Sequence, residues 1–412
     1  MRNLFKIAIR NLIRYKRRTL LTASLITIGV VFVLVFVSVS GSFKSMITGQ
    51  ITDSMMGHLQ IHRKGYVASI DNLPLNLNMK PNAYQTIRQA LAADEQVEAF
   101  SPRLKFGAMF SNFTETTNIR LNGIDPEAEF RTVPLLPSRI LEGKSTVGRG
   151  EILIPALLAK GMKVKPGDPV VIVATNADGS VNGMQFTVAG ILESATGPGG
   201  RDGYVRMEDA AQVLRMTEPE ISEVAIRLKD FGRLAAAVQH LKNATAGEVN
   251  PQGQPLFEVH SWEDLSPFFN IARMIDIMTF FIRIMLIAIV LISIMNVMVM
   301  AVYERIREIG TIAAIGTPPG KIRSMFILEG FCMGVVGAGA GVGIGAVLIA
   351  LLNLIGIRFD FGQQKGLLLK ATLDPPDLLV VSVIVITVAV LASLQPAVKA
   401  SRMEPIDALR HV

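Results

Sequence analysis

The sequence has little charge and a single cysteine. Only 18% of its 412 residues are charged, whereas 50% are hydrophobic. A water-soluble domain of this size carries more charge, so the apolar excess indicates membrane-spanning segments. Cys332 alone excludes a disulfide framework and a cysteine metal cluster, and we expect a buried thiol there. The net charge is +7, but no pattern interleaves basic with aromatic residues, which disfavours nucleic acid as a partner.

Catalytic motifs are also missing. The sequence has no Gly-x-Ser-x-Gly and no His-Glu-x-x-His pattern. The segment 316–321 resembles a phosphate loop, but its glycine spacing is one residue short, and Ile322 stands where a hydroxyl should hold magnesium. Two prolines in this segment also remove N–H donors. We therefore predict a non-catalytic chain that binds no cofactor itself.

The histidines His58 and His62 form a short-range pair of possible metal ligands. They lie four residues apart and would share one face of a strand. A metal site needs further ligands, and the sequence indicates none. We therefore expect two solvated strand residues and no metal site.

Four segments are long and apolar enough to cross a bilayer, which needs about 20 apolar residues. We predict transmembrane helices at 19–44, 268–303, 326–357 and 377–398. The second belongs to an apolar helical run from Pro267 to Tyr303, about 55 Å long. Its excess length predicts a stalk outside the bilayer, with Arg273 and Asp276 as an i,i+3 ion pair.

Basic residues predict the orientation of these spans. The first 18 residues carry seven cations and no acid, which places them in the cytoplasm. With four spans the segment 304–325 and the tail 399–412 are also cytoplasmic, whereas the loop 358–376 and the domain 45–267 lie outside. The segment 38–40 resembles a signal-peptide cleavage site, but the apolar stretch is too long for a signal core, so we favour an uncleaved anchor.

The first 18 residues also show helical periodicity. An apolar face with cations around it predicts an amphipathic helix on the inner leaflet, and an orientation signal alone would use the same cations. The residues that share this face are Leu4, Ile7, Ala8, Asn11 and Leu12.

The outer domain alternates strand and helix patterns. We predict a mixed α/β part at about 45–125 and 220–266, and a β-rich insertion at about 126–219 with short apolar runs between tight turns. A helix should begin near Pro81 with Asn82 as its N-cap. The glycine-rich segment 196–203 is expected to be a surface connection. The fold class is thus a four-helix membrane protein with an extracytoplasmic α+β domain.

The third span contains glycines at four-residue spacing. Gly337, Gly341 and Gly345 would lie on one helix face and allow another helix to approach closely. A seam that slides and a static packing contact explain this pattern equally well.

A compact charged segment follows the second span, and we call residues 302–316 the elbow. Its charges alternate in sign, and cations alone would suffice to mark a membrane boundary. The acids therefore favour contact with a cytoplasmic partner. The candidate contact residues are Tyr303, Glu304, Arg305, Ile306, Arg307, Glu308, Ile309, Gly310, Ile315 and Gly316.

The elbow resembles the coupling segment of the FtsX/MacB/LolCE-type permease family, the mechanotransmitting (type VII) ABC transporters. The segments 8–22 and 396–410 resemble the two ends of the same family, and the resemblance extends over the whole chain. It implies four spans per subunit, two permease subunits (two copies or two homologous chains), and an outer domain with a porter-like α/β part. It also implies an ATPase dimer that binds ATP and Mg²⁺, and the missing phosphate loop places that ATPase in a separate chain.

The resemblance implies that the elbow meets a groove of the ATPase, with Arg305, Arg307, Glu304 and Glu308 in salt bridges and Ile306, Ile309 and Ile315 in apolar contact. ATP-driven movement would reach the outer domain of a bacterial inner-membrane permease. Our first expectation is lipoprotein release, with an acyl-chain cavity near Phe36, Phe43, Met274 and Met278. The alternatives are MacB-like efflux of peptides or amphiphiles with a periplasmic adaptor, and FtsX-like signalling to a periplasmic enzyme.

Overall fold

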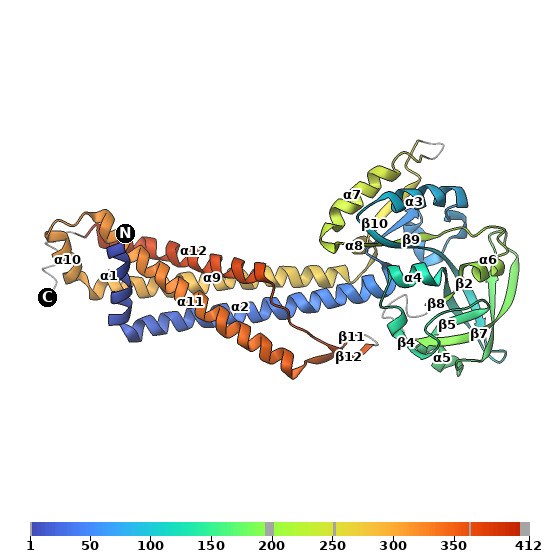
Figure 1. Ribbon diagram of the computed structural model, residues 1–412, viewed down its shortest axis with the longest axis horizontal. Helices are drawn as coiled ribbons and strands as arrows, with labels where there is room; N and C mark the ends of the chain where they lie inside the picture. Colours follow the sequence, from blue (N-terminus) through green and yellow to red (C-terminus); the bar gives the residue numbers. More distant parts are fainter. Residues whose placement is uncertain (1, 194–201, 250–252, 362–363, 404–412) are drawn as a thin grey trace. The chain divides into compact units, whose positions relative to one another are not determined.

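The computed structural model describes residues 2–193, 202–249, 253–361 and 364–403, which form two compact units (Figure 1). The helical unit comprises Met1–Ser45, Arg273–Arg358 and Leu368–Val412, and the outer unit comprises Met46–Ala272 and Phe359–Leu367. Most of the predicted loop at 196–203 lies outside the described residues, as does the 404–410 part of the carboxy-terminal motif at 396–410.

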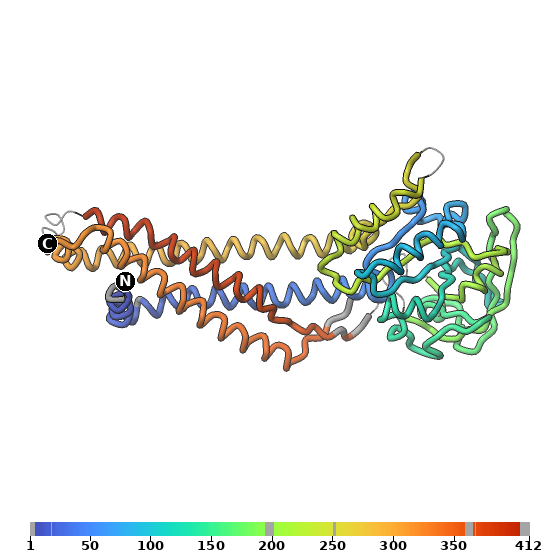
Figure 2. Tube along the Cα trace, turned by 45° about the horizontal axis from the view of Figure 1, so that its top comes forward, coloured from blue at the N-terminus to red at the C-terminus, as the bar shows by residue number. Residues whose placement is uncertain are grey.

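The helical unit contains four helices long and apolar enough to span a membrane, which confirms the prediction of four spans. They are α2 (Lys16–Ile51), α9 (Phe269–Glu304), α11 (Pro319–Ile355) and α12 (Pro375–Ser401). They run alongside one another in Figures 1 and 2 and share a buried core that includes Ile26, Met298, Phe326 and Val385. Their outward faces are apolar too, with Leu20 71% and Leu354 82% exposed, as expected for helices surrounded by lipid.

Two short helices complete this unit. The amphipathic helix α1 (Arg2–Arg14) packs against α11, and α10 (Ile306–Ala314) follows directly after α9. An ion pair joins α2 to α9, because Lys44 Nζ lies 2.6 Å from Asp276 Oδ2. The predicted Arg273–Asp276 pair is therefore wrong, since the carboxylate of Asp276 binds the cation of a neighbouring helix instead.

The outer unit is built on one hydrogen-bonded network of ten strands. Its order is β10-β1-β9-β2-β3-β8-β5-β7-β4, with β6 bridging β2 and β7. The long strand β2 organises the network, because it pairs with β9 through its first half and with β3 and β6 through its second. The strands are β1 (Leu59–Arg63), β2 (Val97–Ser111), β3 (Thr116–Ile124), β4 (Ile140–Gly143), β5 (Glu151–Pro155), β6 (Pro169–Thr175), β7 (Val181–Leu192), β8 (Asp202–Arg206), β9 (Glu223–Leu228) and β10 (Phe257–Ser261).

Strands from both predicted parts of the outer domain join this network. Those from the segment 126–219 are connected to the remainder through the β3–β8 and β2–β6 pairings. The boundary between an α/β part and a β-rich part therefore stays a prediction. A separate pair of short strands, β11 (Arg358–Phe361) and β12 (Gln364–Leu368), precedes α12 in the sequence.

Helices of the outer unit pack on the sheet network. They are α3 (Pro81–Ala93), α4 (Pro126–Thr132), α5 (Ala156–Met162), α6 (Met207–Val213), α7 (Leu234–Thr245) and α8 (Trp262–Leu265). Helix α3 begins as predicted, but Lys80 rather than Asn82 is its N-cap. Pro81 occupies the first helical position, where its fixed φ suits the helix and its missing N–H costs nothing.

Candidate functional site

The elbow is a sharp break between two helices. Helix α9 ends at Glu304, Arg305 leaves the helical conformation (φ −113°, ψ 17°), and α10 begins at Ile306. The Arg305 side chain donates from Nε to Glu308 Oε2 over 3.0 Å, which links the N-cap of α10 to its first turn. The break therefore lies at a residue whose own side chain stabilises the new helix.

A buried ion cluster holds this break against two other helices. Arg305 Nη1 donates to Glu329 Oε1 of α11 over 3.0 Å, and both side chains are at least 94% buried. Asn11 of α1 donates to the same oxygen over 2.7 Å, and Arg14 lies 3.5 Å from Glu308. The cluster thus joins α1, α10 and α11, and a displacement of any one of them must strain its hydrogen bonds.

This burial corrects two predicted roles. Arg305 is 5% exposed and Ile309 is 1% exposed, so neither presents a side chain to a partner, whereas we had predicted that both contact the ATPase. Arg305 binds Glu329 internally, and Ile309 packs in the core of the helical unit. Gly310 is buried as well, and Ile306 is half-buried. Sequence reasoning missed Asn11 and Glu329 as partners; the isolated carboxylate of Glu329 at the start of a glycine-rich span was an available signal.

The exposed part of the elbow is smaller than predicted. Tyr303 is 51% and Ile315 81% exposed, and Glu304, Arg307 and Gly316 are exposed as well. Lys399 of α12 donates to the Tyr303 hydroxyl over 2.7 Å. These side chains form the surface that can meet a partner, and their contact with an ATPase stays a prediction.

The conformation of Gly316 explains how Ile315 is presented. Gly316 has φ +93° and donates to Ala313 O over 3.0 Å, while Thr317 donates to Ile312 O over 3.3 Å. This pair of bonds is the Schellman arrangement that ends a helix, and it favours glycine because a Cβ is disfavoured at positive φ. The chain turns immediately after Ile315 and leaves its side chain projecting.

The glycines of α11 divide into three groups. A Cβ on Gly337, Gly341 or Gly345 would lie 2.5, 2.6 or 3.3 Å from side-chain atoms of α2. Gly330 and Gly334 instead face α12, where a Cβ would lie 2.6 and 2.7 Å from its side chains. A Cβ on Gly339 or Gly343 would meet no heavy atom of the described residues within 4 Å, so these two glycines face outward. The four-residue spacing groups these glycines by helix face, but it does not show which neighbour each face meets.

The four residues of the predicted acyl-chain cavity lie on α2 and α9. Phe36 and Phe43 are half-buried on α2, whereas Met274 and Met278 of α9 are 55% and 47% exposed. The Lys44–Asp276 ion pair joins the two helices beside Phe43 and between the two methionines in sequence. A cavity common to these four residues stays a prediction.

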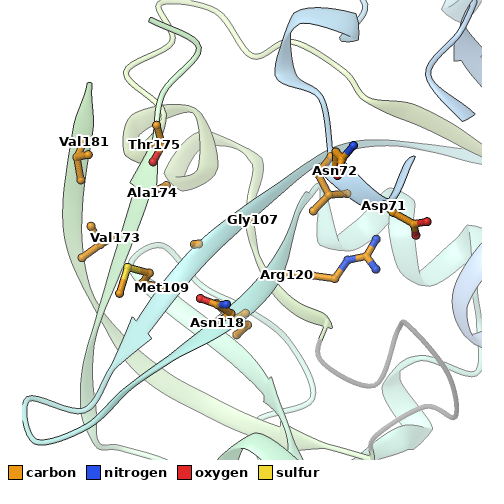
Figure 3. Close-up of a pocket in the computed structure, with 13 residues that line it drawn as sticks. Asp71, Asn72, Gly107, Met109, Asn118, Arg120, Val173, Ala174, Thr175 and Val181 are labelled. Carbon is orange, nitrogen blue, oxygen red and sulfur yellow. The ribbon is translucent and has the colours of Figure 1, made fainter. Parts of the chain in front are cut away.

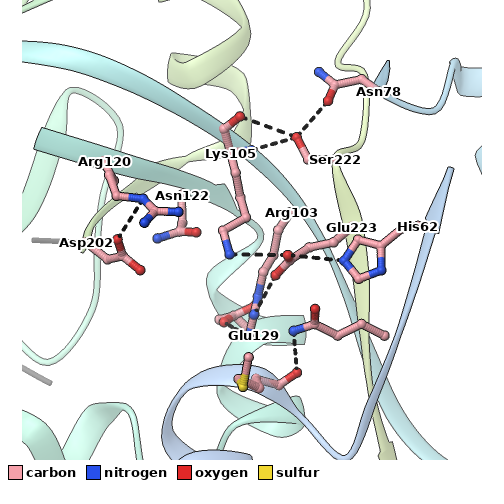
Figure 4. Close-up of polar contacts among 12 residues, drawn as sticks. His62, Asn78, Arg103, Lys105, Arg120, Asn122, Glu129, Asp202, Ser222 and Glu223 are labelled. Carbon is pink, nitrogen blue, oxygen red and sulfur yellow. Dashed lines mark hydrogen bonds and ion pairs between the residues drawn. The ribbon is translucent and has the colours of Figure 1, made fainter. Parts of the chain in front are cut away.

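The outer unit contains a second buried charge cluster, centred on Glu223 (Figure 4). Arg103 of β2 contacts Glu129 at 2.7 Å and Glu223 at 2.9 Å, and Lys105 lies 3.2 Å from Glu223. Burial raises the pKa of Glu223, but Lys105, His62 and Arg103 outweigh it and hold that pKa well below the usual value. The buried carboxylates of Glu129 and Glu223 are thus neutralised by Arg103 and Lys105, and an unpaired charge in this interior would destabilise the domain.

The prediction of solvated histidines is wrong. His62 is fully buried, with Nε2 3.7 Å from Glu223, and His58 is 5% exposed and accepts from Leu228 N over 3.0 Å. Strand β1 is paired along both edges, with β9 and β10, and residues 59–62 are all buried, so both of its faces are covered. The Tyr66 ring, for example, stacks on His62 with 5.4 Å between the ring centroids. Within the described ranges, no group of three or more His, Cys, Asp or Glu side chains is placed to hold a metal.

A hollow of about 450 Å³ lies on the outer unit between two hairpins (Figure 3). Met109 of β2 and Asn118 of β3 line one side, and Val173 and Val181 line the other. Arg120 lines this hollow and also a second pocket of about 190 Å³ that Glu223 lines.

Comparison with known protein families shows to which family the chain belongs. The MacB-like periplasmic core domain matches residues 19–244, more than half of the chain, and the FtsX-like permease C-terminal domain matches 280–405. The chain belongs to the FtsX/MacB/LolCE family of ABC transporter permeases. It is therefore a membrane protein with a large outer domain, of a kind that is typically non-catalytic, and its family implies an ATPase partner and a dimeric arrangement.

Relatives of more than one kind are similar to this chain. The permease is 23% identical to the lipoprotein-releasing system transmembrane protein LolC of Neisseria meningitidis, over 95% of this chain and 94% of LolC. It is 27% identical to the macrolide export ATP-binding/permease protein MacB of Nitrobacter winogradskyi, over 71% of this chain but 44% of MacB. The solved extracellular domain of the ABC-type transporter YknZ matches 49% of the chain at 14% identity and a TM-score of 0.33.

Proposed function

We propose that this permease transmits the movements of a separate cytoplasmic ATPase to its outer domain and thereby releases lipoproteins from the bacterial inner membrane. The observation that carries the coupling role is the elbow itself. Arg305 and Glu329 fix α10 to α11 in the interior, while Ile315 projects from the far end of the same helix. A force on Ile315 therefore acts on a segment bonded to the start of a long span.

The proposal includes an orientation. The basic residues before the first span favour an orientation with both chain ends and the elbow in the cytoplasm and the outer unit in the periplasm. The ATP and Mg²⁺ belong to the partner ATPase. A second permease, either another copy or a homologous chain, completes the transporter.

Lipoprotein as cargo is supported by the relative LolC, to which this chain aligns over 94% of LolC's length at 23% identity. MacB-like efflux is the second candidate, favoured by the match of residues 19–244 to the MacB-like periplasmic core domain. The two candidates differ in partner, because efflux predicts a periplasmic adaptor that stays bound in mild detergent.

Reconstitution in vesicles tests the cargo and the coupling role separately. The permease, purified with whatever ATPase and second permease remain bound, is placed in vesicles that contain a fluorescent lipoprotein. We expect release of the lipoprotein with ATP and none with ADP. ATP hydrolysis without release of any lipoprotein would reject this cargo and leave the coupling role standing. The absence of any bound ATPase in repeated purifications would count against the coupling role.

A further inference from the structure

A cavity of about 620 Å³ lies under the elbow, between α1, α10 and α11. Its walls are mostly apolar and include Ile7 of α1, Ile309 and Ile312 of α10, and Ile322 and Met325 of α11. Ile7 is 45% exposed, so the apolar wall reaches the surface of the molecule. All three helices belong to the helical unit, and the cavity lies where α9 ends and α11 begins, at the boundary of two spans.

The charges around this cavity are predominantly positive. Arg10 and Arg14 follow Ile7 by three and seven residues and so share its face of α1, and Lys321 of α11 lines the cavity itself. Glu308, an acid of the lining, is already bound by Arg305 and Arg14. Within the described part of the chain, neither Arg10 nor Lys321 forms an ion pair with an acidic side chain.

An occupant must match both properties. The apolar walls favour a hydrocarbon chain, because burial of apolar surface is the main driving force of such contacts. The two exposed cations favour a negative headgroup at the mouth. Within the inner leaflet, one molecule combines both, and it is an anionic phospholipid.

We infer that the cavity between α1, α10 and α11 is a binding site for one anionic phospholipid of the inner leaflet. Its phosphate lies between Arg10 and Lys321, and the start of an acyl chain lies against Ile7 and Ile312. The bound lipid bridges α1 to the elbow beside the Arg305–Glu329 pair, and so it adds to the forces that set the position of α10. This inference rests on the proposed cytoplasmic placement of the elbow.

The test measures lipid retention by the purified permease in the absence of ATPase. The permease is reconstituted in discs with equal amounts of phosphatidylglycerol and phosphatidylcholine of the same acyl chains, extracted, and examined by native mass spectrometry. We expect one phosphatidylglycerol to be retained preferentially per chain. Lys321→Glu should lower this preference at least about fivefold, because one cation near an anionic lipid is worth a factor of that size.

Arg323→Glu is the matched control, since Arg323 is exposed on the same helix but does not line the cavity. It should retain phosphatidylglycerol as the unaltered permease does, and Arg10→Glu should resemble Lys321→Glu. Equal retention of the two lipids by the unaltered permease would overturn the inference and favour a protein segment as the occupant. If Arg323→Glu and Lys321→Glu lowered the retention of phosphatidylglycerol equally, the preference would come from general surface charge and the cavity would not be the binding site. Failure of the coupling role alone would leave these lipid results unchanged.

Discussion

Arg305, inside the elbow, donates a hydrogen bond over 3.0 Å to Glu329, which lies 24 positions further along the chain on α11. Both side chains are almost fully buried, and Asn11 shares the same carboxylate oxygen. A buried pair of this kind positions the helices that carry it, because either partner alone would be an uncompensated charge. The elbow is therefore fixed from the inside and available for contact at its outer tip.

Glu329→Gln should destabilise the helical unit strongly. The substitution leaves the Arg305 charge buried with only the half-exposed Glu308 as a partner, and loss of one partner of a buried pair costs about 3–5 kcal/mol. Thermal unfolding of the detergent-solubilised permease measures this loss. Glu308→Gln is the control and should cost about 0–1 kcal/mol, since the side chain of Glu308 is 40% exposed. Equal losses in the two variants would contradict a special role for the buried pair.

Ile315→Asp should abolish coupling without affecting stability. The side chain is 81% exposed, so its replacement changes stability by less than about 0.5 kcal/mol. A carboxylate at this tip would have to be desolvated in an apolar contact with a partner, which should lower ATP-driven transport at least about tenfold. Transport and unfolding are measured on the same preparation. Full transport by Ile315→Asp would show that the tip is not a contact point.

A charge reversal distinguishes contact from internal structure within the elbow. Glu304→Lys alters an exposed position, whereas Glu308→Lys removes a partner of both Arg305 and Arg14. We expect Glu304→Lys to uncouple ATP hydrolysis from transport while stability changes by no more than about 1 kcal/mol, because interactions of an exposed charge are weak. We expect Glu308→Lys to lower both coupling and melting temperature. If Glu304→Lys left the ratio of transport to ATP hydrolysis unchanged, Glu304 would not belong to the contact surface.

The glycines of α11 provide an internally controlled test of helix packing. Gly337→Ala and Gly341→Ala should each destabilise the permease by about 1–3 kcal/mol, because the new methyl groups would overlap Ile26 and Val30. Gly339→Ala and Gly343→Ala should be neutral or slightly stabilising, since nothing in the described part of the chain lies within 4 Å of their added methyl groups. The double variant Gly337→Ala/Ile26→Ala should recover part of the loss. Similar melting temperatures for all four single variants would reject the seam with α2.

The Glu223 cluster predicts a pH-dependent stability of the outer domain. The pKa of Glu223 is lowered in the folded state, so its contribution is present above the unfolded pKa of 4.5 and is lost as the pH falls through the folded value. Glu223→Gln should therefore lose about 3–5 kcal/mol at pH 7 relative to the unaltered chain. Unfolding monitored at a series of pH values should show this difference shrink below about pH 4. A difference independent of pH would contradict an ionised Glu223.

Much of this architecture could be predicted from sequence because membrane spans leave a strong local signal. The four apolar runs gave four helices, and the charged elbow was found at the end of the second. The partners of buried charges could not be predicted in the same way. Arg305 and Glu329, or Arg103 and Glu223, meet only through tertiary packing, and an exposed salt bridge and a buried one have the same local sequence.

The predictions for the histidines and for the glycines of α11 fell short for a related reason. His62 is buried because both faces of its strand are covered, for example by the stacked ring of Tyr66, and no local sequence pattern contains that packing. The spacing of the α11 glycines showed which of them share a face, but not which face meets α2 and which faces outward. The coupling role was predicted from the resemblance to a known family. Which elbow residues are buried, such as Arg305, and which are exposed, such as Ile315, depends on tertiary packing and could not be predicted.

The most direct measurement of the coupling role is site-specific photocrosslinking from position 315 in the complete transporter. A photoreactive residue replaces Ile315, and a second variant carries it at Ile355, which is 75% exposed at the opposite end of α11. The account predicts a crosslink to the ATPase from position 315, with a yield that changes when ATP binds, and none from position 355. No ATPase crosslink from position 315, or an equal yield from both positions, would contradict it.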